Sequence, residues 1–312
     1  MSYRYFLCIV LIASLGFSQK SQGGAPRGLY NSFTKITPEI EMPLLDIDAL
    51  LQEDESLPPG KPYRYGSRFP VDLSPHNSGV WETLLDGTRV WKLIISSQFA
   101  YAMNLSFDSF YLPENSKLFI YNPDFSMIYG AYTELNNNSE EVFASPLLKG
   151  DELIIEYSEP VDVSEEFKLH IEYVVHDYKD ILNFFNERNE NRGCGYNAVC
   201  PEANSYENQI NAVSWLDMGG YICTGSMLNN TAQDLTPYYI TAWHCAEGEN
   251  VSTFRFYFNY ETTSCGGSWA NEGSYAYGSI QRASSGSMDG DFTLLEITGT
   301  IYDSWDVYYA GW

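Results

Sequence analysis

Short runs of aromatic and β-branched residues recur along most of this chain, and they constrain its fold more than any other feature. Runs of this kind, separated by Gly, Asn, Ser and Pro, indicate β-strands joined by turns. They predict six strands in the middle of the chain, at 90–96, 100–106, 117–121, 127–132, 152–157 and 168–175. This spacing is typical of a β-sandwich, jelly-roll-like in form, over residues 80–178. We therefore expect an all-β protein.

The sequence ahead of the expected sandwich has a different character. Residues 1–18 contain the parts of a secretory signal peptide: Arg4 at the start, an apolar core over 6–15, and Gly16-Phe17-Ser18 as a small-x-small cleavage site. This core is too short to predict a membrane span. Residues 19–79 are Pro-rich with few periodic runs, and they predict an N-terminal segment with a short helix over 39–51.

The charge of the chain narrows the classes of partner. A net charge of -24 argues against nucleic acid, whose phosphates bind Lys and Arg, and against anionic membrane surfaces. Acidity of this kind also keeps an extracellular protein in solution. We expect a secreted monomer that has neither nucleic acid nor a membrane as its partner.

The cysteines divide the chain sharply. Cys8 lies in the expected signal peptide, and the other five all lie in one stretch of the last 120 residues. They are Cys194, Cys200, Cys223, Cys245 and Cys265. Exported proteins favour disulfides over free thiols. Because five is an odd number, one of these cysteines has no partner within the chain.

One short segment brings a histidine and a cysteine together at the end of an expected strand, 238–240. This strand runs into His244 and Cys245, and Cys223 lies about twenty residues upstream. A histidine at a strand end is held rigidly, which suits a general base. A zinc site of Cys223, His244 and Cys245 is the alternative, but an adjacent His-Cys pair lacks the usual ligand spacing. We therefore expect no metal and no cofactor.

Several separate motifs lie in the last third of the chain. They are Cys194 with Cys200, Cys223-Thr224-Gly225-Ser226-Met227-Leu228-Asn229-Asn230-Thr231, Ile240-Thr241-Ala242-Trp243-His244-Cys245, Phe258-Asn259-Tyr260 with Cys265, Asp291-Phe292-Thr293-Leu294-Leu295-Glu296, and Tyr309-Ala310-Gly311-Trp312. Together, over residues 193–312, they resemble the trypsin-like serine peptidases, and most of all the lysyl endopeptidase branch of secreted bacterial enzymes. The alternative is a β-rich secreted domain in which a histidine merely flanks a disulfide.

The resemblance implies an organisation for the whole chain. Residues 193–312 would hold the first β-barrel of a two-barrel peptidase, incomplete at its C-terminal end. Residues 19–79 and the sandwich over 80–178 would be a pro-segment and a pro-region. The charged stretch 179–192 would be a linker with a processing site, for which Lys179, Arg188 and Arg192 are candidates.

The resemblance also implies how the cysteines pair. It pairs Cys223 with Cys245 and Cys200 with Cys265. It leaves Cys194 to pair with a cysteine beyond residue 312.

Two members of a catalytic triad can be assigned from the same resemblance. In this family a histidine takes the proton of the nucleophile, and an aspartate orients the imidazole and stabilises its charge. His244 is the only histidine after residue 193. Asp291 matches the family pattern and precedes an apolar strand, so its carboxylate can reach inward. Asp289 is the rival for this role. The alternative interpretation of Asp289 is that it is a solvated turn residue.

The nucleophilic serine has no good candidate. The family places it in a Gly-x-Ser-Gly loop well after the aspartate, whereas the only similar stretch, 283–287, precedes Asp291. Ser285 is therefore a poor candidate. Together with the unpaired Cys194, this predicts that the chain stops before the serine, and that the chain as given is inactive.

The sequence thus predicts the precursor of a secreted serine endopeptidase acting on polypeptides. Cleavage after lysine is the leading expectation, and no lysine occurs after Lys179, so such an enzyme would escape self-digestion. The rival is a non-catalytic secreted protein whose sandwich binds a partner such as carbohydrate, and whose protease-like part is degenerate.

Overall fold

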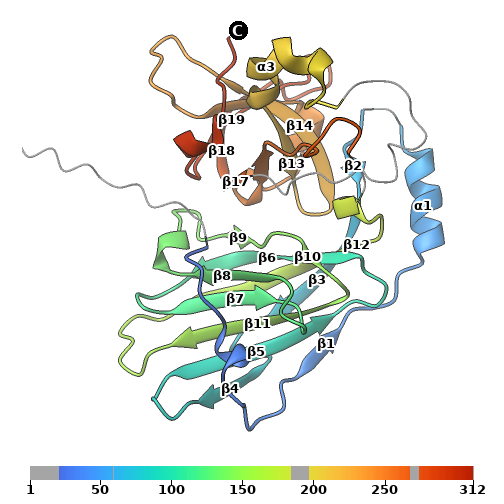
Figure 1. Ribbon diagram of the computed structural model, residues 1–312. Helices are drawn as coiled ribbons and strands as arrows, with labels where there is room; N and C mark the ends of the chain where they lie inside the picture. Colours follow the sequence, from blue (N-terminus) through green and yellow to red (C-terminus); the bar gives the residue numbers. More distant parts are fainter. Residues whose placement is uncertain (1–20, 59, 184–196, 268–273, 312) are drawn as a thin grey trace, which may run out of the picture.

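The computed structural model describes residues 21–58, 60–183, 197–267 and 274–311 (Figure 1). Their secondary structure is mainly β, in three sheets, which confirms the all-β class. The expected signal peptide, Arg188, Arg192 and Cys194 lie outside the described residues. Among the described residues, no helix has the length and apolar character needed to cross a membrane.

The helices are short and lie between the strands. The α-helices are α1 (Ile47–Ser56), α3 (Glu207–Ala212) and α4 (Trp243–Ala246). The 3-10 helices are η1 (Arg27–Leu29), η2 (Glu134–Asn136), η3 (Ile181–Asn183), η4 (Pro201–Tyr206), η5 (Val251–Thr253) and η6 (Asp303–Trp305). Helix α1 begins where the Asp46 side chain accepts a hydrogen bond from the Ala49 backbone N–H, as N-cap residues do.

Two sheets form a sandwich from the first half of the chain, drawn in the lower part of Figure 1. The six-stranded sheet contains β1 (Glu39–Glu41), β5 (Arg89–Ser96), β11 (Glu152–Glu159), β7 (Lys117–Tyr121) and β8 (Ile128–Tyr132) in that order, with β4 (Val80–Thr83) paired to β5. The five-stranded sheet contains β10 (Leu148–Lys149), β6 (Ala102–Tyr111), β12 (Lys168–Asp177) and β3 (Gly66–Leu73), with β9 (Phe143–Ala144) paired to β6.

The connections between the two sheets give the sandwich a jelly-roll topology. The chain crosses repeatedly from one sheet to the other, so β5, β11, β7 and β8 are neighbours in one sheet while β10, β6, β12 and β3 are neighbours in the other. Two interlocked Greek keys of eight strands have this order. The core lies between the sheets, because alternate residues such as Leu93 and Ile95 on β5 and Leu105 and Phe107 on β6 point inward and are buried.

The strands upstream of residue 80 differ from the sequence prediction. Residues 39–41 form strand β1, parallel to β5, and the helix begins only at Ile47. The predicted helix over 39–51 was therefore wrong in its first half. Strand β3 lies in the segment with few periodic runs and contains Pro70, which argues against a central strand. Because β3 is an edge strand, this proline is tolerated there.

A third sheet forms a closed barrel from the second half of the chain. Its order is β17 (Ser274–Tyr277), β16 (Arg255–Phe258), β13 (Val213–Asp217), β14 (Tyr221–Leu228), β15 (Tyr238–Thr241), β19 (Thr293–Ile297) and β18 (Ser279–Ser284). The two end strands, β17 and β18, are consecutive in the chain and are joined only by Gly278, whose φ is +80°. One bent strand thus pairs with β16 on one side and β19 on the other, and this closes the sheet.

The sandwich and the barrel share a buried polar network. Arg255 and Asp217, both on barrel strands, form an ion pair with an Nη2–Oδ2 distance of 2.6 Å, and both side chains are fully buried. The hydroxyl of Tyr65, from the first half of the chain, donates to the other carboxylate oxygen of Asp217 at 2.9 Å. Arg68 extends the contact through hydrogen bonds to the backbone oxygens of Met218 and Gly219.

Two buried titratable residues at the end of β12 have opposite effects on the pH dependence of stability. Burial raises the pKa of Asp177 to about 7 and lowers the pKa of His176 to about 4. Between pH 4 and 6.5 the folded chain therefore binds an extra proton at Asp177, while the unfolded chain binds one at His176. The free energy of unfolding falls with rising pH on account of Asp177 and rises on account of His176.

We expect Asp177→Asn to expose the contribution of His176. Between pH 4 and 6.5, the slope of the free energy of unfolding against pH should be more positive in the variant than in wild type, by up to about 1.4 kcal/mol per pH unit. Above pH 7, where wild-type Asp177 is ionised, the variant also lacks one of the two oxygens that accept from the backbone N–H groups of Lys179 and Ile181. Urea unfolding across pH 4–8 measures the slope, and a slope equal to wild type would contradict the prediction.

Candidate active site

The predicted strand that leads to the histidine is β15, and it lies in the middle of the barrel wall. Strand β15 pairs with β14 on one side and β19 on the other. Tyr239 at its centre is fully buried, and its hydroxyl accepts a hydrogen bond from Ser214 at 2.8 Å. The chain leaves the sheet after Thr241 and turns into α4, which holds His244. A rigid strand thus fixes the place where the histidine begins.

His244 and Asp291 meet because of the register between two strands. Thr241 pairs with Thr293 in the antiparallel ladder of β15 and β19. His244 follows Thr241 by three residues, and Asp291 precedes Thr293 by two, so both lie beyond the same end of the pair. Asp291 is held in a left-handed conformation, with a φ of +41°, by the loop before β19. Its backbone N–H donates to the oxygen of Ser287 at 3.1 Å.

The carboxylate of Asp291 holds His244 through both its backbone and its ring. The Nδ1 atom of His244 lies 2.9 Å from Oδ2 and 3.0 Å from Oδ1, and the backbone N–H donates to Oδ1 at 3.1 Å. These contacts, led by the backbone hydrogen bond, lower the pKa of Asp291. Since an ionised carboxylate can only accept, the neutral imidazole carries its proton on Nδ1. The lone pair of Nε2 is then left to act as a base.

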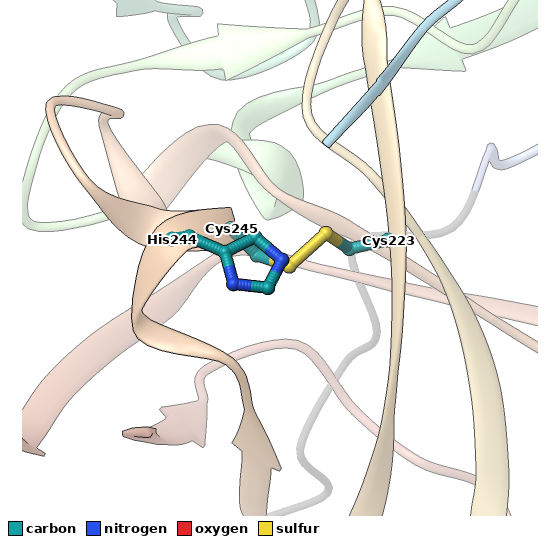
Figure 2. A group of neighbouring side chains, drawn as sticks. All are labelled: Cys223, His244 and Cys245. Atoms are coloured by element: carbon teal, nitrogen blue, oxygen red, sulfur yellow. A yellow bond between two sulfur atoms is a disulfide. The ribbon is translucent and has the colours of Figure 1, made fainter. Parts of the chain in front are cut away.

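A disulfide fixes the other side of the histidine. Cys245 is bonded to Cys223 on β14, and Figure 2 shows the imidazole of His244 beside this bond. The second disulfide joins Cys200 to Cys265. The structure therefore contains both pairings that the resemblance implies, while Cys194 lies outside the described residues.

The same three residues are the only group of potential metal ligands found among the described residues. The ligand atoms of Cys223, His244 and Cys245 lie within 4.8 Å of one another. Both sulfur atoms are bonded to each other, however, so neither is a thiolate that could bind zinc. Nδ1 of the imidazole faces Asp291. The donor set therefore does not fit a metal site.

Removal of the Cys223–Cys245 disulfide is expected to destabilise the barrel. The bond closes a loop of 22 residues, and replacement of both cysteines by alanine should lower the free energy of unfolding by about 3 kcal/mol. Denaturant unfolding under non-reducing conditions measures this. The matched control replaces Cys200 and Cys265, whose bond spans 65 residues and should cost at least as much. An unchanged midpoint for the first variant would contradict the prediction.

The two other candidate residues, Asp289 and Ser285, make no hydrogen bond with His244 in the structure. Asp289 is an exposed turn residue and makes no hydrogen bond with His244. The hydroxyl of Ser285 donates to the oxygen of Ser287 at 2.8 Å and accepts from the N–H of Phe292 at 3.2 Å. Ser285 thus closes the loop before β19. Within the described part of the chain, no serine hydroxyl is hydrogen-bonded to His244.

A segment that the sequence did not single out also lies next to this site. Strand β2 (Tyr63–Arg64) pairs with the start of β14, just before Cys223. Lys61 lies 4.0 Å from Glu247, three residues after the histidine. No local pattern could have predicted this, because the contacts join residues more than 150 positions apart.

Comparison with known proteins links part of this chain to lysyl endopeptidases. Residues 188–312 match the family model described as lysyl endopeptidase, C-terminal domain. A lysyl endopeptidase of Pseudomonas aeruginosa is 29% identical over 137 residues. That alignment covers 39% of this chain and 29% of the relative, so the chain matches under a third of the relative's length. The part of the chain that holds His244 and Asp291 is thus similar to a peptidase domain.

Proposed function

We propose that this chain is part of the precursor of a secreted serine endopeptidase. The observation that carries the proposal is the His244–Asp291 pair at the end of the β15–β19 ladder, within the stretch similar to lysyl endopeptidases. A histidine whose Nδ1 donates to an ionised aspartate presents Nε2 as a general base. We propose His244 as the general base and Asp291 as the residue that orients it.

In the proposed mechanism, Nε2 of His244 takes the proton of a serine hydroxyl while that oxygen attacks the peptide carbonyl. The imidazolium that forms is stabilised by the Asp291 carboxylate, and it then returns the proton to the leaving amine. We propose that this serine is supplied by polypeptide outside residues 1–312. The oxyanion donors and the specificity pocket would come with it.

We further propose that cleavage follows lysine. The name of the matched relative supports this, as does the absence of lysine after Lys179. Maturation is proposed between Lys179 and Cys194. Lys179 itself is a poor site, because its side chain is only 12% exposed and its Nζ lies 2.5 Å from Asp54. N-terminal sequencing of the active form would test this, and a start outside that interval would contradict it.

The experiment that tests the function uses the protein expressed from its complete reading frame. A fluorophosphonate probe should label one serine, and the labelled peptide identifies it by mass spectrometry. Peptide substrates that differ only in lysine or arginine at the cleaved position then test the specificity. Absence of both labelling and hydrolysis would favour the alternative, a non-catalytic secreted binding protein.

A further inference from the structure

Strand β14 has an edge that would be open beside His244 if no other segment covered it. On one side, β14 pairs with β13 as far as Ile222. On the other side, β15 pairs only with Gly225–Leu228 and then turns away to form α4. On this second side, the backbone of the first half of β14 is therefore left without a partner from the barrel. Such an edge binds extended peptides by adding them as a further strand.

In this structure residues 60–66, which we call the strap, cover that edge. Tyr63 pairs with Ile222, and Arg64 pairs with Tyr221, in antiparallel register. The strap thus lies in line with β15, at the point where β15 departs. Figure 1 shows β2 beside the barrel, at the end of the chain segment that continues into β3 of the sandwich.

The strap also contacts the loops that hold both members of the candidate pair. Lys61 lies 4.0 Å from Glu247 in the turn after α4. A Cβ atom built on Gly60 would lie 3.2 Å from Cε of Met288, in the loop that leads to Asp291. An extended peptide that approached His244 along β14 would have to occupy the same space.

The two ends of the strap are held with different strength. At its far end, the backbone N–H groups of Tyr65 and Gly66 both donate to the oxygen of Gly220, at 2.9 and 3.0 Å. The Tyr65 hydroxyl is buried against Asp217. At its near end, Lys61 and Glu247 are both about half exposed, and exposed ion pairs contribute little. Between the two ends, Arg64 forms ion pairs with Asp54 and Glu53 of α1, at 2.7 and 2.9 Å. The strap is therefore held firmly from Arg64 onward, and only its near end is held weakly.

We propose that the strap is a built-in competitor for extended peptides at the β14 edge, so that the chain in this conformation is latent. The proposal rests on the proposed function, because it takes the peptides to be substrates. A segment tethered this closely has an effective concentration of roughly millimolar. It therefore suppresses binding of weak peptide ligands even though its near end makes only a weak contact.

The test measures peptide binding to the protein expressed from its complete reading frame, with His244→Ala to stop turnover and self-processing. The probe is a fluorescein-labelled nonapeptide with one central lysine, followed by fluorescence polarisation. Tyr63→Gly with Arg64→Gly loosens the strap. The matched control is Glu39→Gly with Glu41→Gly in β1, another short strand that lies far from the barrel. Thermal unfolding confirms that each variant is folded.

We expect the loosened strap to lower the Kd of the peptide at least tenfold, and the β1 control to leave it unchanged. A second variant, Arg64→Cys with Tyr221→Cys, joins two residues that face each other across the ladder and should abolish binding. Unchanged affinity in the loosened variant, or undiminished affinity in the locked one, overturns the proposal. Fluorophosphonate labelling of the protein with His244 intact tests the serine peptidase function separately. The proposal for the strap and the proposed function can therefore fail independently.

Discussion

Replacement of His244 by alanine is expected to reduce kcat for peptide hydrolysis by about 10⁶-fold in the protein expressed from its complete reading frame. Without the imidazole no group removes the proton from the serine. Asp291→Asn should reduce kcat by about 10⁴-fold, because an amide in that place favours the wrong tautomer of the ring. Turnover of a chromogenic lysine substrate measures both effects.

The control for these variants is another histidine of the same chain. His76 stacks on Phe167 in the sandwich, with ring centroids 5.1 Å apart, and His76→Ala should leave kcat within about twofold of wild type. The His244→Ala, Asp291→Asn double variant should be no slower than His244→Ala alone, because the two residues act as a unit. A His244→Ala protein that kept a tenth of its activity would exclude His244 as the base.

The second large effect is expected at the buried ion pair. Asp217→Ala leaves the Arg255 guanidinium without its carboxylate in a fully buried site, which should cost about 3–5 kcal/mol of the free energy of unfolding. Arg255→Met should cost a similar amount, since it leaves the Asp217 carboxylate without its guanidinium partner. Urea unfolding of the intact chain measures both.

A double variant distinguishes the cost of leaving one charge unpaired from the cost of removing both charges. Asp217→Leu with Arg255→Met replaces two buried charges by apolar groups and should regain much of the loss in either single variant. Tyr65→Phe, which removes only the hydroxyl that donates to Asp217, should cost about 1–2 kcal/mol. A cost below about 1 kcal/mol for both charge-deleting variants would show that water reaches the pair.

Local sequence patterns predicted those strands that are rich in aromatic and β-branched residues and are bounded by turn residues. The expected strand 117–121 coincides with β7, and 152–157 lies within β11 (Glu152–Glu159). Strand β3 was missed because Gly66 and Pro70 are unfavourable in a strand interior, and only its place at a sheet edge makes them acceptable. Strand β1 was missed because it is short and gains its stability from β5.

The candidate site was predictable to the extent that it lies within one barrel. His244 and Asp291 were assigned from motifs, and the strand register then shows how two residues 47 positions apart come together. The strap and Tyr65 could not be predicted in this way. Their partners lie over 150 residues away, and no periodicity in residues 60–66 records that they will pair with a barrel.

The closure of the barrel at Gly278 has a consequence for how copies of this protein behave toward one another. Open sheet edges recruit strands from other molecules and start aggregation. A sheet that shares one bent strand between both ends offers no such edge, except where β15 departs from β14. Because β2 covers that place, the same two residues that pair with Tyr221 and Ile222 also keep the barrel from adding strands of other molecules there.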